Sequence, residues 1–189
     1  MTKPVKIGFD LDGVLLYNPA RIFRPITVGM KKFLGGESSN KTHFYYPHSP
    51  TEKFLWKIIH WSSLYIAPGF NEIKTLSKKG LIEPYIITSR YDCLKADFEH
   101  WLKRMHAHSY FKATFHNKKN LQPHVFKEQM IQKLGLKYFV EDNFDIVSHL
   151  TRKTPAKTIW ITNPFDSHIE YEPKFMTLKK AMTHIRGML

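Results

Sequence analysis

Two aspartates stand two residues apart at the end of an apolar stretch, in the run Phe9-Asp10-Leu11-Asp12-Gly13-Val14. Alternate residues of a strand face the same side, so Asp10 and Asp12 are expected to project together, and Gly13 permits a sharp exit. Two carboxylates so placed repel each other unless a cation or a shared proton compensates. A calcium loop does not fit, because it needs an oxygen ligand where this chain has Val14. The pair suits phosphoryl transfer through a covalent intermediate, in which one carboxylate attacks phosphorus and the other handles the proton.

Magnesium would relieve the repulsion between these carboxylates, since it takes hard oxygen ligands and bridges carboxylates to phosphate. A further acidic group should then arrive from another strand, and Glu141-Asp142, which follow an apolar run, supply it. Polar residues also follow Ile86-Ile87, in the order Thr88-Ser89-Arg90. Arg90 could clamp a phosphate with two hydrogen bonds or form a salt bridge with solvent or the cap described below, and both alternatives stay open.

Strands and helices are expected to alternate along most of the chain. Strands are predicted at 5–11, 84–88, 113–116, 138–141 and 158–162, and helices at 71–79, 92–105, 124–134, 143–150 and 175–185. This order predicts an α/β fold, a Rossmann-like three-layer α/β/α sandwich with a mostly parallel sheet. Ligands of such sheets bind beyond the carboxyl ends of the strands, where Asp10, Thr88 and Glu141 would meet.

Residues 17–67 interrupt the alternation with proline, glycine and clustered aromatics. We interpret them as a small, mainly helical cap inserted into a core formed by residues 1–16 and 68–189. A helix is predicted over 53–65, and its apolar residues indicate packing or a lid at the mouth of the site.

The composition places limits on the class of protein. With 189 residues, 42% of them hydrophobic, the chain can bury a substantial core, and its one cysteine cannot form an internal disulfide. The acidic residues in the first apolar stretch argue against a membrane span, so we expect a cytoplasmic protein. A net charge of +13 favours an anionic partner: a basic surface steers phosphorylated substrates, and nucleic-acid binding stays open.

The ordered set Phe9-Asp10-Leu11-Asp12-Gly13-Val14, Ile86-Ile87-Thr88-Ser89-Arg90, Lys127 and Val140-Glu141-Asp142-Asn143 resembles the four motifs of the haloacid dehalogenase (HAD) superfamily. Pro68-Gly69 before the helix that leads to the second motif is also similar to that family. The motifs span residues 5–145.

The resemblance implies a role for each matching residue. Asp10 would be the nucleophile and Asp12 the general acid and base, Thr88 would bind the transferring phosphoryl group together with Ser89 and Arg90, and Lys127 would neutralise charge. Lys118 or Lys119 could supply that charge instead. Magnesium would be held by Asp10, Asp142 and the backbone carbonyl of Asp12, with Glu141 as a direct ligand or a support behind one.

Within the superfamily that the chain resembles, an acid at position 12 implies a phosphatase, and a phosphomutase stays possible. The small helical insertion is similar to that of the 5'-nucleotidase and deoxyribonucleotidase branch, so a nucleotide is a plausible substrate, on whose base the aromatics of the cap could stack: Tyr17, Phe23, Tyr45, Tyr46 and Trp61. The alternatives are a polynucleotide-end phosphatase that uses the basic surface, and a noncatalytic binding module.

Overall fold

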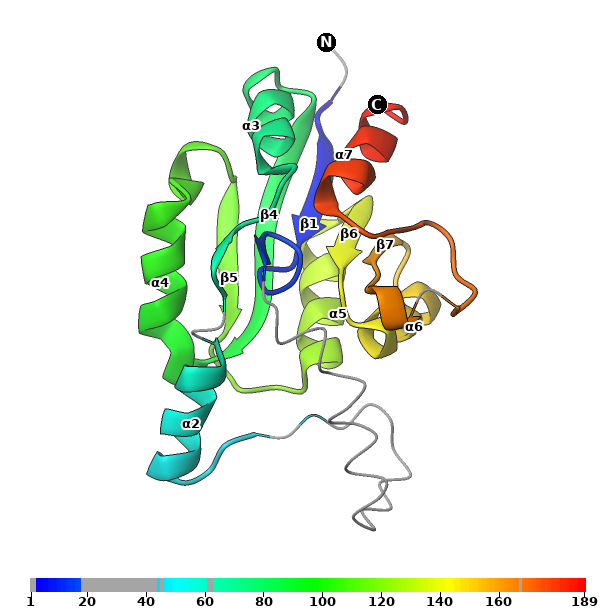
Figure 1. Ribbon diagram of the computed structural model, residues 1–189. Coiled ribbons are helices and arrows are strands. Elements are labelled where there is room, and N and C mark those ends of the chain that lie inside the picture. The colour runs from blue at the N-terminus through cyan, green and yellow to red at the C-terminus, as the bar shows by residue number, and fades with distance from the viewer. Residues whose placement is uncertain (1–2, 18–43, 45, 61–62, 167) are drawn as a thin grey trace.

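The computed structural model of the chain describes residues 3–17, 44, 46–60, 63–166 and 168–189 (Figure 1). Its strands are β1 Val5–Phe9, β2 Leu16–Tyr17, β3 Tyr65–Ile66, β4 Ile82–Tyr91, β5 Ala113–Asn117, β6 Tyr138–Glu141, β7 Lys157–Ile161 and β8 Lys174–Phe175. Its α-helices are α2 Pro50–His60, α3 Phe70–Lys78, α4 Lys95–Arg104, α5 Pro123–Leu134, α6 Phe144–Lys153 and α7 Leu178–Arg186. Short 3-10 helices span Asp92–Leu94 (η2), Ala107–Ser109 (η3) and Pro164–Asp166 (η4).

Six strands form one sheet in the order β5-β4-β1-β6-β7-β8, and every neighbouring pair is parallel. The parallel direction follows from the helices, since each crossover returns the chain to the same end of the sheet. The predicted Rossmann-like α/β fold with a mostly parallel sheet is confirmed.

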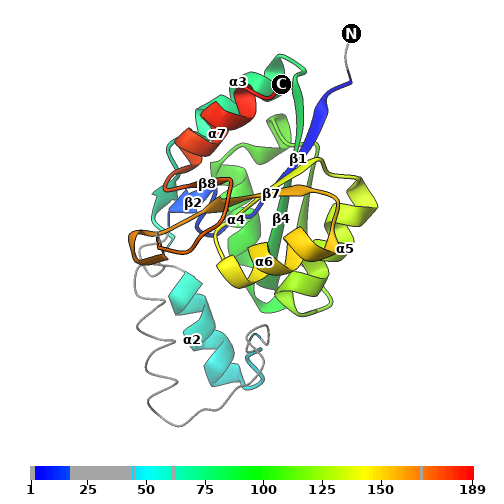
Figure 2. The same cartoon turned by 90° about the vertical axis from the view of Figure 1, so that its right-hand side faces the viewer.

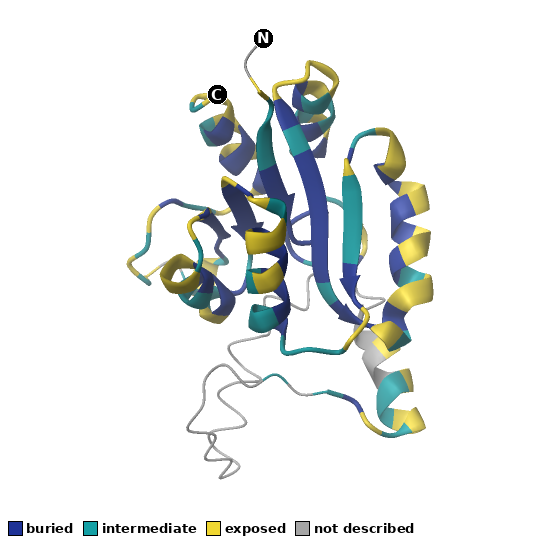
Figure 3. Ribbon diagram, turned by 180° about the vertical axis from the view of Figure 1, so that it is seen from behind, coloured by how far each residue is buried: buried dark blue, intermediate teal, exposed yellow. Residues whose placement is uncertain are grey.

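Each face of the sheet is covered by its own group of helices (Figures 1 and 2). Alternate strand residues divide between two apolar cores: Phe9 and Ile86 pack with α3, α4 and α7, whereas Ile87 and Phe139 pack with α5 and α6. Figure 3 shows the result, with buried strands between helices whose outer faces are exposed. The central strands are therefore apolar on both sides, and polar residues at their ends require a separate explanation.

Several predicted boundaries were wrong, each for a local reason. The first strand ends at Phe9, because residues 11–15 form a turn. The second predicted strand continues to Tyr91, and the helix expected at 92 begins as η2 before α4 starts at Lys95. Phe175 lies in the unpredicted strand β8, and α7 starts after Thr177, whose Oγ1 accepts a hydrogen bond from the backbone N–H of Lys180 at 3.3 Å.

The 17–67 segment leaves and re-enters the core through an antiparallel pair, in which Leu16 lies opposite Ile66 and Tyr17 opposite Tyr65. Its helix α2 starts three residues earlier than predicted, and Tyr65 belongs to β3. The earlier start has a clear cause. Ser49 Oγ accepts from the Glu52 backbone N–H, and a Glu52 carboxylate oxygen accepts from the Ser49 N–H, both at 3.1 Å, which is a capping box.

Candidate active site

Three adjacent strands of the sheet, β4, β1 and β6, bring the predicted motifs together at their carboxyl ends. Phe9 pairs with Ile86 on one side and with Val140 on the other. The next residue, Asp10, donates its backbone N–H to Val140 O at 3.0 Å, which fixes the chain as it leaves β1. Asp10, Thr88 and Glu141 thus arise from adjacent strands, as the sequence predicts.

Lys127 of α5 reaches these strand ends and joins two carboxylates. Its Nζ lies 3.1 Å from Asp10 Oδ2 and 2.5 Å from Glu141 Oε2. All three side chains are buried, Lys127 and Glu141 almost completely. Lys127 belongs to the buried stripe of α5, beside Phe126 and Ile131, a position that is normally apolar. The structure brings Lys127, and neither Lys118 nor Lys119, to Asp10, since both of those side chains are exposed.

The electrostatics of this group show an excess of negative charge. Burial raises the pKa of Asp10 well above its ordinary value, and Glu141 and Asp142 raise it further against the opposing effect of Lys127. Burial also raises the pKa of Glu141. Burial disfavours the charge on Lys127, but the attraction of Asp10 and Glu141 outweighs it and raises the pKa of the ammonium group. One ammonium faces three carboxylates, so a further cation fits here.

A metal ion would find hard oxygen ligands at this point. Asp10, Glu141 and Asp142 each offer a carboxylate oxygen, and these oxygens lie within 4.8 Å of one another. Asp10 Oδ1 is buried and has no hydrogen-bond partner among the described residues. Glu141 is more occupied, because Oε2 contacts Lys127 and Oε1 accepts the backbone N–H of Asn143 at 3.0 Å. Three clustered carboxylates with a free buried oxygen fit Mg²⁺.

Asp12 lies in the turn after β1, where Gly13 adopts a φ of +80° that favours glycine. Strand β1 has ended before Asp12, so strand alternation does not by itself fix the direction of this side chain, although its charge lies close enough to raise the pKa of Asp10. Asp12 forms a fork with Arg90: Nε donates to Oδ2 at 2.8 Å and Nη2 to Oδ1 at 2.7 Å. Ser63 Oγ also donates to Asp12 Oδ1, at 3.0 Å.

Arg90 forms salt bridges with Asp12 and Asp97, which both lie in the core, whereas the predicted alternatives were a phosphate clamp or a salt bridge with solvent or the cap. Its third nitrogen, Nη1, donates to Asp97 of α4, so the guanidinium is held by two carboxylates. The pairing of β4 with β5 shifts register between Thr88 and Tyr91, and such an irregularity re-aims the side chains next to it. Sequence alternation alone could not reveal this shift.

Thr88 and Ser89 offer hydroxyl groups at the same strand end. Thr88 is buried, and its Oγ1 accepts the backbone N–H of Arg90 at 3.3 Å. The Ser89 Oγ atom is buried and has no hydrogen-bond partner among the residues that the structure describes. Buried hydroxyls normally have partners, so a ligand oxygen fits this position.

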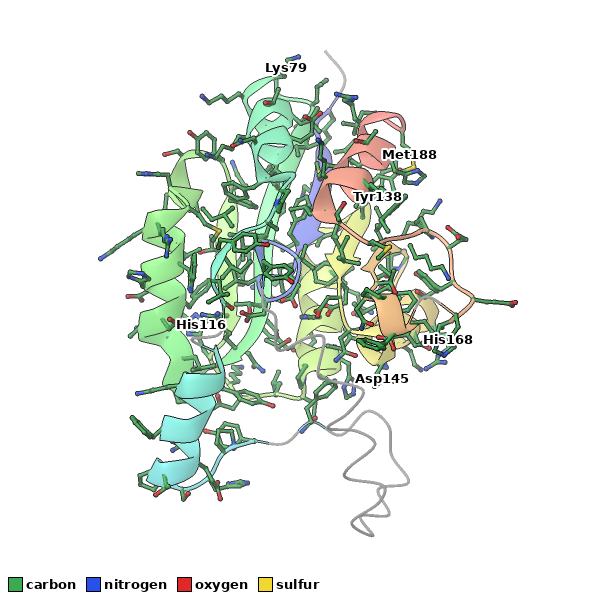
Figure 4. All side chains as sticks on the ribbon, in the orientation of Figure 1. Lys79, His116, Tyr138, Asp145, His168 and Met188 are labelled. Carbon is green, nitrogen blue, oxygen red and sulfur yellow. The ribbon has the colours of Figure 1, made fainter. Side chains whose placement is uncertain are left out.

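Asp145 lies outside the cluster. It is exposed in the first turn of α6, and its backbone N–H is capped by Asn143 Oδ1 at 3.0 Å (Figure 4). An acid at this position interacts favourably with the helix dipole. Asn143 therefore both starts α6 and fixes Glu141, a dual role that the sequence motif did not indicate.

Only two of the five aromatic residues proposed to stack on a nucleotide base, Tyr17 and Tyr46, lie in the part of the chain that the structure describes. Tyr17 stacks on Tyr65 with ring centroids 4.8 Å apart, and Tyr46 meets Tyr91 edge to face at 4.9 Å. Phe23, Tyr45 and Trp61 lie outside the described residues. Tyr17 therefore packs within the β2-β3 pair, and Tyr46 packs against Tyr91 of β4.

Among the described residues, none of the helices combines the length and apolar character needed to cross a membrane. No protein-family model matches the chain, and no curated protein sequence matches it significantly.

Solved structures do match in fold. A protein from Thermotoga maritima assigned as a β-phosphoglucomutase superimposes with a TM-score of 0.61 at 13% identity, covering 98% of this chain and 100% of that chain. CbbY from Rhodobacter sphaeroides, in complex with phosphate, superimposes with a TM-score of 0.58 at 12% sequence identity, and the match covers 95% of this chain and 96% of CbbY. A HAD-superfamily hydrolase from Ehrlichia chaffeensis superimposes with a TM-score of 0.53 at 15% sequence identity, and the match covers 100% of this chain and 98% of that hydrolase. The chain therefore has the Rossmann-like α/β fold that HAD-superfamily hydrolases share.

Proposed function

We propose that the chain is a Mg²⁺-dependent phosphomonoester hydrolase that acts through an aspartyl phosphate on Asp10. The observation that carries the proposal is the buried cluster at the end of β1, where Lys127 touches Asp10 and Glu141 beside Asp142. A buried lysine paired with a strand-end carboxylate is costly for stability alone and serves a site that receives a dianion. The fold shared with a HAD-superfamily hydrolase and with a protein assigned as a β-phosphoglucomutase supports this choice.

In the first half of the reaction, a carboxylate oxygen of Asp10 attacks phosphorus, and the bond from phosphorus to the leaving oxygen breaks. Asp12 gives its proton to that oxygen, so the leaving group departs as a neutral alcohol. Lys127 neutralises the charge on Asp10 and on the phosphoryl oxygens, while the hydroxyls of Thr88 and Ser89 hydrogen-bond the latter.

In the second half, water attacks the phosphorus of the aspartyl phosphate while Asp12 accepts a proton from it. Inorganic phosphate leaves, and the Asp10 carboxylate is regenerated. Asp10, Asp142 and the backbone carbonyl of Asp12 would hold Mg²⁺, with Glu141 as a support that aims Lys127. Bound there, the ion would offset the negative charge of the carboxylates and of the phosphate.

The substrate is proposed to be a small phosphorylated metabolite, with residues 17–67 acting as the cap that covers it. CbbY has been solved with phosphate and with xylulose-(1,5)bisphosphate, which makes sugar phosphates a natural class to test beside nucleotides. No described contact singles out a base, because Tyr17 and Tyr46 are both engaged with other rings.

The test is phosphate release from a panel of 5'- and 3'-nucleotides, sugar phosphates and a 3'-phosphorylated oligonucleotide, with Mg²⁺ present. The proposal expects turnover of at least one small phosphomonoester, lost with a chelator and restored by Mg²⁺. Turnover of the oligonucleotide alone, with a steep inverse dependence on salt, would favour the polynucleotide-end alternative. Activity that survives complete metal removal would contradict the site.

A further inference from the structure

Arg90 is a buried cation whose whole guanidinium is directed at carboxylates. Its side chain is 1% exposed, and two of its nitrogens form a fork on Asp12 while the third binds Asp97. A fork of two hydrogen bonds fixes the plane of a carboxylate, which a single point contact cannot do. Arg90 therefore sets how Asp12 is oriented after the chain has left the regular geometry of β1.

Asp97 makes the fork rigid. It lies in the first turn of α4, so the guanidinium is tied at once to the turn after β1 and to a helix that packs on the sheet. Because Asp97 still binds Nη1 when Asp12 changes its contacts, the Arg90 side chain stays in place. The geometry is that of a preorganised support for one carboxylate.

Ser63 brings the insertion into the same network. It is 5% exposed and lies two residues before β3, on the segment that returns from α2 to the core. Its hydroxyl donates to Asp12 Oδ1, the same oxygen that accepts from Arg90 Nη2. One oxygen of Asp12 is thus shared between the core and the 17–67 segment.

Asp12 is fixed by hydrogen bonds but is only partly buried. Its side chain keeps 24% exposure despite the fork. Ser63 and Asp97 also line a hollow of about 330 Å³ together with His100 and Trp101. Open space therefore adjoins Ser63 and Asp97, two members of the network, on the side of α4.

We propose that Arg90 is a positioning residue for Asp12, and that Ser63 is the contact through which the insertion shares in orienting it. The inference rests on the proposed function, in which Asp12 gives a proton to the leaving oxygen and then takes one from water. When Asp12 carries the proton on one oxygen, the other oxygen still accepts from Arg90.

The test compares two esters whose need for a proton donor differs. An aryl ester such as p-nitrophenyl phosphate leaves without protonation, whereas an alkyl ester such as glycerol phosphate requires it. Since kcat/KM reports only the steps up to departure of the leaving group, a misplaced Asp12 lowers the alkyl value selectively. For Arg90→Gln we expect a loss of about 100-fold on the alkyl ester and less than about 3-fold on the aryl ester.

Three further variants sharpen the comparison. Arg90→Lys keeps the charge without the fork and should recover only part of the alkyl activity, and Ser63→Ala should lower that activity by about 3- to 10-fold. Arg104→Gln removes an exposed arginine from α4 and should change neither ester. An equal fall on both esters in Arg90→Gln, or a rise on the alkyl ester, would overturn the inference.

A second measurement is independent of activity. If the fork exists in solution, the melting temperature of the double variant Asp12→Asn with Arg90→Gln should be no lower than that of Arg90→Gln alone, because both partners are then neutral. Additive losses would overturn the fork. If the wild-type chain hydrolyses neither these esters nor any member of the panel above, the proposed function fails. If it hydrolyses both esters and the variants lower both activities equally, the function stands and the positioning role fails.

Discussion

Replacing Lys127 by methionine removes the one ammonium that contacts both buried carboxylates. Methionine is similar in length and apolar, so the buried position on α5 stays filled, while Asp10 and Glu141 lose their partner. Breaking a buried ion pair by removing one side costs about 3–5 kcal/mol, because the other charge stays buried. For a chain of this size each kcal/mol lowers the Tm by about 2–4 °C. Lys127→Met should therefore melt about 6–20 °C below the wild type.

The assay is thermal or urea unfolding without added metal, with Lys133→Met as the control, since Lys133 is an exposed lysine of the same helix. The control should stay within about 0.5 kcal/mol. Adding Glu141→Gln to Lys127→Met removes one of the stranded charges and should recover about 1–2 kcal/mol. Hydrolysis by Lys127→Met should fall at least about 100-fold. A single variant as stable as the control, or a double variant that is less stable than the single one, would refute the reasoning.

Other positions give further predictions. Gly69→Ala should lower the free energy of unfolding by about 2–4 kcal/mol, because φ there is +109° and a Cβ would lie 2.5 Å from the backbone at the start of α7. Gly80→Ala, where φ is +67° and the space around is open, should lower it by about 1 kcal/mol. Urea unfolding of both variants checks this difference. Burial lowers the pKa of His116 from its ordinary value of 6.5, so the unfolded chain binds that proton more readily than the folded chain. The stability that His116 contributes above pH 6.5 is therefore lost as the pH falls through the lowered pKa of the folded state. His116→Gln should flatten this part of the curve of Tm against pH, and an unchanged curve would show that His116 is not the cause. Asn143→Ala should cost about 1 kcal/mol through the lost cap of α6, measured by unfolding, and a neutral effect would show that the cap contributes nothing.

Much of the fold could be predicted from the sequence, because the strands are short apolar runs separated by helical patterns. The β6 strand, for example, was predicted with its observed bounds, 138–141. The errors fall where a local interaction overrides periodicity. The capping box at Ser49 and Glu52 was present in the sequence and could have located the start of α2. The register shift near the end of β4 has no such signal.

The candidate site was predicted in its membership more than in its contacts. The sequence order indicated that Asp10, Lys127 and Glu141 belong to one site, and the structure places them together. The partners of Asp12 could not be predicted, since the turn at Gly13 and the fork from Arg90 depend on tertiary packing. Ser63 was missed because nothing in its neighbourhood distinguishes it from a connecting residue; only its contact with Asp12 does so.

The central claim is that Asp10 carries the phosphoryl group, and the most direct measurement is mass spectrometry of the protein after acid quenching during turnover of a phosphomonoester with Mg²⁺. The account predicts one added phosphoryl group on the peptide that contains Asp10, removed by hydroxylamine as an acyl phosphate is, and absent from Asp10→Asn, which should also release no phosphate. Turnover that continues in Asp10→Asn, or a phosphoryl group found on another residue, would contradict the account.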